Sequence, residues 1–147
     1  MRIERMTRAH LDAVAALEQR CFGEPWSRGA LELLLSDMAC GRVALNETDE
    51  VIAYGGMLFA PGEGQITNIA THPDARRRGA ARKVLDALIE AAERRGAEQV
   101  SLEVRASNAA ALALYEGRGF SVAGRRRNFY RAPTEDALVM LLPLSGE

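Results

Sequence analysis

The fold is constrained most by a strand–helix–strand unit built around a basic loop that ends in glycine. Gln65–Thr71 (QITNIAT) predicts a strand, which Pro73 terminates because proline lacks a backbone donor. The loop Ala75–Gly79 leads into a helix over Ala80–Arg95, whose apolar residues form one stripe. Val100–Val104 then alternates like a strand. This arrangement predicts an α/β (α+β) sandwich with a mixed central sheet flanked by helices.

The remaining periodicity predicts further short helices and strands in a single domain, residues 1–147, without repeats or linkers. Helices are expected at Thr7–Cys21, from Ser27 with the apolar side Leu31, Leu34, Leu35 and Met38, and from Ser107 or Asn108 to Arg118. Strands are expected at Arg2–Arg5, Arg42–Leu45, Val51–Phe59, Ser121–Asn128 and Asp136–Leu142, with a hairpin turn at Asn46–Asp49.

Composition excludes several classes of function. The formal net charge of −1 lacks the basic excess of an electrostatic DNA binder. No run of about 18 apolar residues is present, and the N-terminus does not resemble a signal peptide. Cys21 and Cys40 are expected to be reduced thiols of a cytoplasmic protein, with a disulfide between them as the alternative. No ligand spacing predicts a metal site.

The loop Arg76–Ala81 (RRRGAA) predicts an anion site at the start of a helix. A helix N-terminus carries unpaired amides and a partial positive charge, and Gly79 lets a ligand approach the backbone. These properties suit a pyrophosphate, although the spacing is neither a P-loop nor a dinucleotide fingerprint. The alternative is an ordinary basic turn before a surface helix.

Three other residues could carry chemistry, and each has a simpler structural explanation. Glu103 points away from the apolar face of its strand, as a solvated carboxylate also would. Tyr115 follows Leu112 at helical spacing, as a half-buried core tyrosine would. Asn108 could act as a helix N-cap. None of the three is specific alone, but their order and spacing are informative.

In that order the motifs resemble the GCN5-related N-acetyltransferase family over essentially the whole chain. The matching segments are Asn68–Pro73, Arg76-x-x-Gly79-x-Ala81 and Asn108-x-x-Ala111-x-x-Leu114-Tyr115-x-x-x-Gly119-Phe120. Within the family, Leu102–Asn108 (LEVRASN), Pro25–Ser27 and Arg126–Tyr130 (RRNFY) are similar to bacterial enzymes that acetylate the N-terminal alanine of a small-subunit ribosomal protein. Ala81 departs from the pattern, because that position is usually glycine in the family.

The resemblance implies that acetyl-CoA binds as co-substrate, without a metal, between splayed parallel strands Gln65–Thr71 and Val100–Val104. Asn108 would contact the cofactor arm. Main-chain groups of Ile69, Ala70 and Thr71 would bind the pantetheine arm and the acetyl group. The pyrophosphate would bind the amides of Arg77, Arg78, Gly79, Ala80, Ala81 and Arg82.

The resemblance also assigns the proton transfers, with Glu103 as the base and Tyr115 as the acid. The amine would attack the thioester directly. Because an ordinary carboxylate is a weak base for an α-ammonium group, Glu103 is expected to be shielded from solvent or to act through a water molecule. An amide of the strand at residues 69–71 would stabilise the oxyanion.

Trp26, Phe129 and Tyr130 would flank the entrance for the substrate, the N-terminus of a ribosomal protein. For Trp26, a place over the core between the first two helices is the alternative. Arg125, Arg126 and Arg127 could steer the chain toward ribosomal RNA, but a solvated strand edge is the simpler interpretation, and direct nucleic-acid binding is not expected.

Two other classes of function remain open: an acetyltransferase for small amines such as a polyamine, an amino acid or an antibiotic, and a non-catalytic acyl-CoA-binding module. The presence of both Glu103 and Tyr115 argues against the non-catalytic module. The resemblance also allows association with a complex that modifies transfer RNA.

Overall fold

One mixed sheet of seven strands organises the chain in a computed structural model that describes residues 1–144. The expected domain, residues 1–147, extends three residues beyond these. The strands are β1 (Arg2–Arg5), β2 (Ala39–Leu45), β3 (Val51–Ala60), β4 (Glu63–Thr71), β5 (Gln99–Arg105), β6 (Ser121–Tyr130) and β7 (Glu135–Pro143). The α-helices are α1 (Leu11–Cys21), α2 (Arg28–Leu31), α3 (Ala80–Arg94) and α4 (Ala109–Arg118). Short 3-10 helices span Arg8–His10, Glu32–Leu35 and Pro73–Ala75.

The strand order in the sheet is β1-β2-β3-β4-β5-β7-β6, so β7, the last strand within residues 1–144, lies inside the sheet rather than at its edge. Neighbouring strands are antiparallel except β4 and β5, which are parallel and joined through α3. This confirms the expected strand–helix–strand unit and the mixed sheet.

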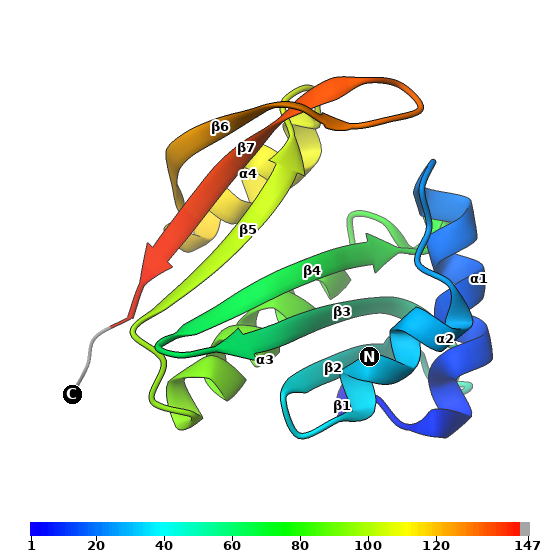
Figure 1. The fold of residues 1–147 in the computed structure, drawn as a ribbon. Coiled ribbons are helices and arrows are strands. Elements are labelled where there is room, and N and C mark those ends of the chain that lie inside the picture. The colour runs from blue at the N-terminus through cyan, green and yellow to red at the C-terminus, as the bar shows by residue number, and fades with distance from the viewer. Residues whose placement is uncertain (145–147) are drawn as a thin grey trace.

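The parallel pair β4–β5 is short and then opens. Only three residue pairs join the two strands, from Glu63 opposite Gln99 to Gln65 opposite Ser101. Beyond them β4 carries a bulge: Gly56 of β3 lies opposite Asn68 and Met57 lies opposite Ile66, which leaves Thr67 as an extra residue. A bulge bends its strand and increases the local twist, so β4 diverges from β5. Figure 1 shows the resulting separation between the two halves of the sheet.

Two apolar clusters cover the two faces of the sheet. On one face, α3 and α4 contribute buried residues such as Val84, Leu88 and Tyr115. On the other, α1 and α2 contribute Leu11, Val14 and Leu31 (Figure 1). The apolar stripe of α3 explains its long continuous helix, because one face packs on β2, β3 and β4 while charged residues remain in water.

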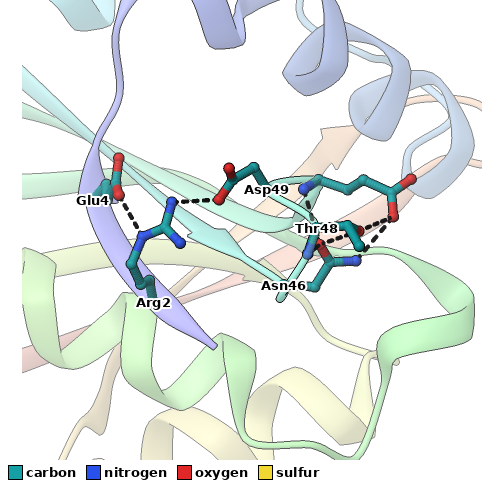
Figure 2. A network of polar contacts seen from close by, with 6 residues as sticks. Arg2, Glu4, Asn46, Thr48 and Asp49 are labelled. Atoms are coloured by element: carbon teal, nitrogen blue, oxygen red, sulfur yellow. Dashed lines mark hydrogen bonds and ion pairs between the residues drawn. The ribbon is translucent and has the colours of Figure 1, made fainter.

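The predicted turn between β2 and β3 is confirmed, and polar contacts fix its shape (Figure 2). The Asn46 side-chain oxygen accepts the amides of Thr48, at 3.0 Å, and Glu50, at 2.9 Å. Arg2 bridges Glu4, at 2.6 Å, and Asp49, at 2.7 Å, so the first strand is attached to the turn. Exposed ion pairs contribute little to the free energy of unfolding. Their main effect here is to hold the N-terminal strand against the turn.

One predicted feature of the second helix is wrong. The expected apolar side included Met38, yet Met38 is 62% exposed. The α-helix ends at Leu31 and a 3-10 segment follows to Leu35, so the periodicity changes from 3.6 to about three residues per turn before the chain reaches Met38. Leu31 and Leu34 remain buried as expected.

Cys21 and Cys40 are free thiols in the structure, so the alternative of a disulfide between them is not realised. No helix within residues 1–144 combines the length and apolar character needed to cross a bilayer.

Candidate active site

A cavity of about 530 Å³ occupies the opening between β4 and β5. Its walls come from β4, β5 and α4, from the segment that joins α1 to α2, and from the β6–β7 hairpin. The structure therefore brings together seven of the predicted site residues: Trp26, Ile69, Glu103, Asn108, Tyr115, Phe129 and Tyr130. These residues are far apart in the sequence, and the bulge in β4 creates the space that they share.

Glu103 lies on β5 with its carboxylate paired to an arginine. Its Oε2 is 2.7 Å from Nε of Arg126 on β6, and the two side chains are 34% and 61% exposed. The structure thus differs from the expectation of a carboxylate shielded from solvent. The two residues meet across β7, which lies between their strands.

Tyr115 is held on α4 by the local sequence around it. The Asn108 side-chain oxygen accepts the Ala111 amide at 3.1 Å and so caps the start of the helix. Gly119 ends the helix with a φ of +110°, and the returning Phe120 packs edge-to-face on Tyr115 with ring centres 5.7 Å apart. Burial, with a smaller contribution from nearby Tyr130, raises the pKa of Tyr115 above its ordinary value. Tyr115 therefore stays protonated at neutral pH.

Tyr130 lies next to both charged residues of β5 that line the cavity. The Arg105 guanidinium stacks on its ring, 4.5 Å from the ring centre. Burial, and secondarily the charge of Glu103, raise the pKa of Tyr130 to about 12. Arg105 also donates to the carbonyls of Arg131 and Pro133, each at 2.9 Å, and so fixes the hairpin that carries Phe129 and Tyr130.

The predicted phosphate-binding residues lie at the start of α3, outside the cavity lining. The first hydrogen bond of this helix runs from the Lys83 amide to the Gly79 carbonyl, so the amides of Ala80, Ala81 and Arg82 have no partner within the helix. Gly79 has a φ of +79° and nothing lies within 4 Å of where its Cβ would stand. An anion could therefore approach these amides directly.

β4 offers further polar groups that a ligand could use. Every second residue of a strand turns its main-chain groups toward one neighbour, and beyond Gln65 the edge of β4 that faces β5 has no partner strand. Thr67 lines the cavity, and its buried hydroxyl has no hydrogen-bond partner among residues 1–144. The side chain of Ala70 is buried in the cluster formed with α1, so only its main chain is available. These groups fit the extended amide-bearing arm of a CoA thioester.

Two loops meet across the mouth of the cavity. The carboxylate of Glu24, between α1 and α2, accepts the amide of Arg131 in the β6–β7 hairpin at 2.7 Å. A Cβ on Gly23 would fall 2.8 Å from the carbonyl oxygen of Ala132, so glycine allows this close approach. These contacts join the segment between α1 and α2 to the β6–β7 hairpin beside the cavity.

The sequence model of the acetyltransferase (GNAT) family matches residues 11–120. The chain belongs to the GNAT family. It is 40% identical over 139 residues to the [ribosomal protein bS18]-alanine N-acetyltransferase of Escherichia coli K12, covering 92% of each chain.

Solved structures of GNAT proteins share the fold of this chain. The crystal structure of the ribosomal-protein-S18-alanine N-acetyltransferase from Escherichia coli has a TM-score of 0.89 and 36% identity, covering 99% of this chain and 96% of that one. A chain of the NatC complex bound to a Gag peptide and CoA has a TM-score of 0.83, covers 99% of this chain and 100% of that one, and is 24% identical, which shows the fold alone.

Sequence reasoning missed several residues that shape this GNAT site. Glu18 is fully buried behind the cavity, and Asn68, which appeared only within a motif, binds it. Glu18 follows Val14 and Leu11 by four and seven residues, so its position on the apolar stripe of α1 was a detectable signal.

Arg126, the partner of Glu103, had no such signal in the sequence. Arg125 instead pairs with Asp136 at 2.8 Å on the exposed strand β6, as a solvated strand edge would.

Proposed function

We propose that this chain is an acetyl-CoA-dependent N-acetyltransferase that modifies the N-terminal alanine of the ribosomal protein bS18. The observation that carries the proposal is the cavity at the β4–β5 opening, which gathers Glu103, Tyr115 and the aromatic residues of the mouth. The 40% identity to an enzyme of that name, over 92% of both chains, supports the choice of substrate. A substrate of this kind implies that the protein acts in the cytoplasm.

The residues at the start of α3 would hold the pyrophosphate, and main-chain groups of Ile69, Ala70 and Thr71 would hold the arm. Acetyl-CoA supplies the acetyl group as a thioester. Asn108 keeps its side-chain oxygen on the Ala111 amide, so its side-chain nitrogen would be the group available to the arm. An amide of residues 69–71 would donate to the acetyl carbonyl oxygen as negative charge develops there.

Glu103 and Tyr115 would handle the two protons of the transfer. Glu103 would accept the proton of the attacking α-amine, directly or through a water molecule, which its partial exposure permits. Tyr115, kept protonated by burial, would donate its proton to the departing thiolate. Trp26, Phe129 and Tyr130 would contact the first residues of the peptide.

A thiol-release assay tests this function. The substrates are an alanine-initiated peptide with the bS18 N-terminal sequence, the same peptide with a blocked N-terminus, and a panel of small amines. We expect turnover on the unblocked peptide alone. Turnover only on small amines would show a different acceptor, and acetyl-CoA binding without turnover would show a non-catalytic module.

The variant Glu103→Gln tests the role of the base in the same assay. We expect turnover to fall by about a hundredfold or more, since positioned acid–base groups contribute roughly 10²–10⁴ in rate. The matched control is Glu116→Gln on the exposed side of α4, which should leave turnover unchanged. An unchanged rate and pH profile in Glu103→Gln would refute the assignment.

A further inference from the structure

The carboxylate of Glu18 is a charged group that lies in the apolar core. It is 0% exposed, and no other charged residue among residues 1–144 is buried. Burying a carboxylate is costly unless hydrogen bonds replace the water it loses. The surroundings of Glu18 must therefore supply several hydrogen-bond donors. The carboxylate in turn fixes the positions of the groups that donate to it.

Three donors from three parts of the chain converge on this carboxylate. The Trp26 amide donates to Oε1 at 2.7 Å, and the Tyr54 hydroxyl of β3 donates to Oε2. The Asn68 side chain of β4 donates to Oε2 at 3.0 Å and more weakly to Oε1 at 3.3 Å. Glu18 itself is on α1, so a single side chain connects a helix, a loop and two strands.

These connections lie directly behind two walls of the cavity. Residues 22–27, which we call the acceptor loop, carry Phe22, Gly23, Glu24 and Trp26 on one wall. Asn68 lines the cavity from β4, together with its neighbours Thr67 and Ile69. Because Trp26 and Asn68 bind the same carboxylate, the separation between the acceptor loop and β4 is set by Glu18.

We propose that Glu18 is a positioning residue that holds the acceptor loop at a fixed distance from β4 and so determines how tightly the acceptor peptide binds. The inference rests on the proposed function, which makes residues on the acceptor loop part of the peptide site. Glu18 does not line the cavity, so it acts through Trp26 and Asn68 rather than by touching substrate.

The chemistry of the site explains why a carboxylate is needed. An ionised carboxylate is acceptor-only and can receive all three donors at once. A glutamine of the same shape would place an NH₂ group at one of the two oxygen positions. At Oε1 this group would face the Trp26 amide, and at Oε2 it would face both Tyr54 and Asn68, so at least one hydrogen bond would be lost without leaving a cavity. Glu18→Gln therefore tests positioning with little change in packing volume.

The single tryptophan of the chain reports on the acceptor loop, because Trp26 is its only source of indole fluorescence. In Glu18→Gln we expect acrylamide quenching of Trp26 to increase at least twofold at a temperature where the protein is folded. We expect the KM for the alanine peptide to rise about tenfold, a typical effect of losing one hydrogen bond to a charged group. The KM for acetyl-CoA should stay within twofold.

Val14→Ala is the matched control, since Val14 is buried one turn earlier on α1 and has no side-chain group that could hydrogen-bond the carboxylate. It should lower the melting temperature without changing quenching or peptide KM. If Val14→Ala reproduces the rise in peptide KM, or if Glu18→Gln raises both KM values equally, the positioning role is wrong. Native quenching and native peptide KM in Glu18→Gln would also overturn it.

A milder variant covers the case in which Glu18→Gln does not fold. Tyr54→Phe removes one donor and leaves the Trp26 bond in place, so a smaller increase in quenching is expected, and unchanged quenching contradicts the proposal. Quenching needs no substrate. A wild-type protein that fails to acetylate the peptide would thus refute the proposed function, while the fluorescence result would still decide the role of Glu18.

Discussion

Nε of Arg126 lies 2.7 Å from Oε2 of Glu103, so the carboxylate proposed as base is already paired with a cation from the neighbouring hairpin. The guanidinium is paired with a carboxylate oxygen to which an incoming α-ammonium group would also bind. Arg126 also lies over the ring of Phe129, 5.9 Å from its centre, next to the proposed peptide entrance. We therefore expect an acceptor that binds at Glu103 to compete with Arg126 for this carboxylate.

Replacing Arg126 by glutamine should lower the KM for the alanine peptide by about twofold to fivefold. The reason is that the substrate ammonium no longer displaces an exposed ion pair, which contributes about 0.2–1 kcal/mol. Steady-state kinetics with varied peptide provide the measurement. The control Arg125→Gln breaks the pair with Asp136 instead and should leave the KM unchanged. A higher KM in Arg126→Gln would mean that Arg126 binds the peptide rather than competing with it.

Tyr115→Phe should lower kcat by about a hundredfold and leave the KM for acetyl-CoA unchanged. Burial raises the pKa of Tyr115 above about 10, so the group remains protonated at every pH below that value. The wild-type rate should therefore rise as the substrate amine, with a pKa near about 8, loses its proton, and it should not fall again before about pH 10. A loss confined to acetyl-CoA binding would show a purely structural tyrosine.

Gly79→Ala should raise the KM for acetyl-CoA by about tenfold. Gly79 begins α3 at a φ of +79°, a conformation that costs other residues about 1–2 kcal/mol. Gly96, just beyond the other end of α3, has a φ of +76° and equally open surroundings. Gly96→Ala should thus lower the melting temperature to the same extent, by roughly 2–8 °C, without changing the KM. Equal KM values in the two variants would rule out a phosphate site at the start of α3.

Acid should loosen the β6–β7 hairpin before it unfolds the rest of the sheet. Hydrogen bonds from the Asn128 amide and Arg125 lower the pKa of Asp136, and hydrogen bonds from Ser107 lower the pKa of Glu135. Groups with a lowered folded pKa stabilise the fold above their unfolded values of about 3.9 and 4.3, and this contribution disappears as the pH falls through the folded values.

Hydrogen exchange measured between about pH 5 and pH 3 tests this expectation. Amides of β6 and β7 should lose protection first. Asp136→Asn should remove part of that pH dependence, whereas Asp12→Asn, on the exposed face of α1, should not affect it. Uniform loss of protection over all strands would contradict a local effect.

Much of the fold could be predicted from the sequence, because capping residues and glycines at the ends of the helices are local signals. Gly79 and Gly96 mark the ends of α3, and Asn108 and Gly119 mark the ends of α4. The structure confirms these boundaries, except that α3 ends at Arg94 instead of Arg95. The Met38 prediction failed because a change from α-helix to 3-10 geometry leaves no clear trace in apolar spacing.

The site was predictable only in part, because its remaining features depend on contacts between distant segments. Thr67 has no sequence signal for a bulge, since the extra residue is defined by the register with β3. The Arg126–Glu103 ion pair could be predicted only if the position of β7 between β5 and β6 were already known. Glu18 finds its donors 8, 36 and 50 residues away, and no local pattern encodes such partners.

The interior position of β7 has a consequence for how the protein is made. Ribosomes deliver this strand after β5 and β6, yet β5 and β6 can join only through it. Until residues 135–143 have emerged, the backbone groups of β5 and β6 that pair with β7 have no partner strand. A premature stop before residue 135 would remove the strand that connects β6 to the rest of the sheet.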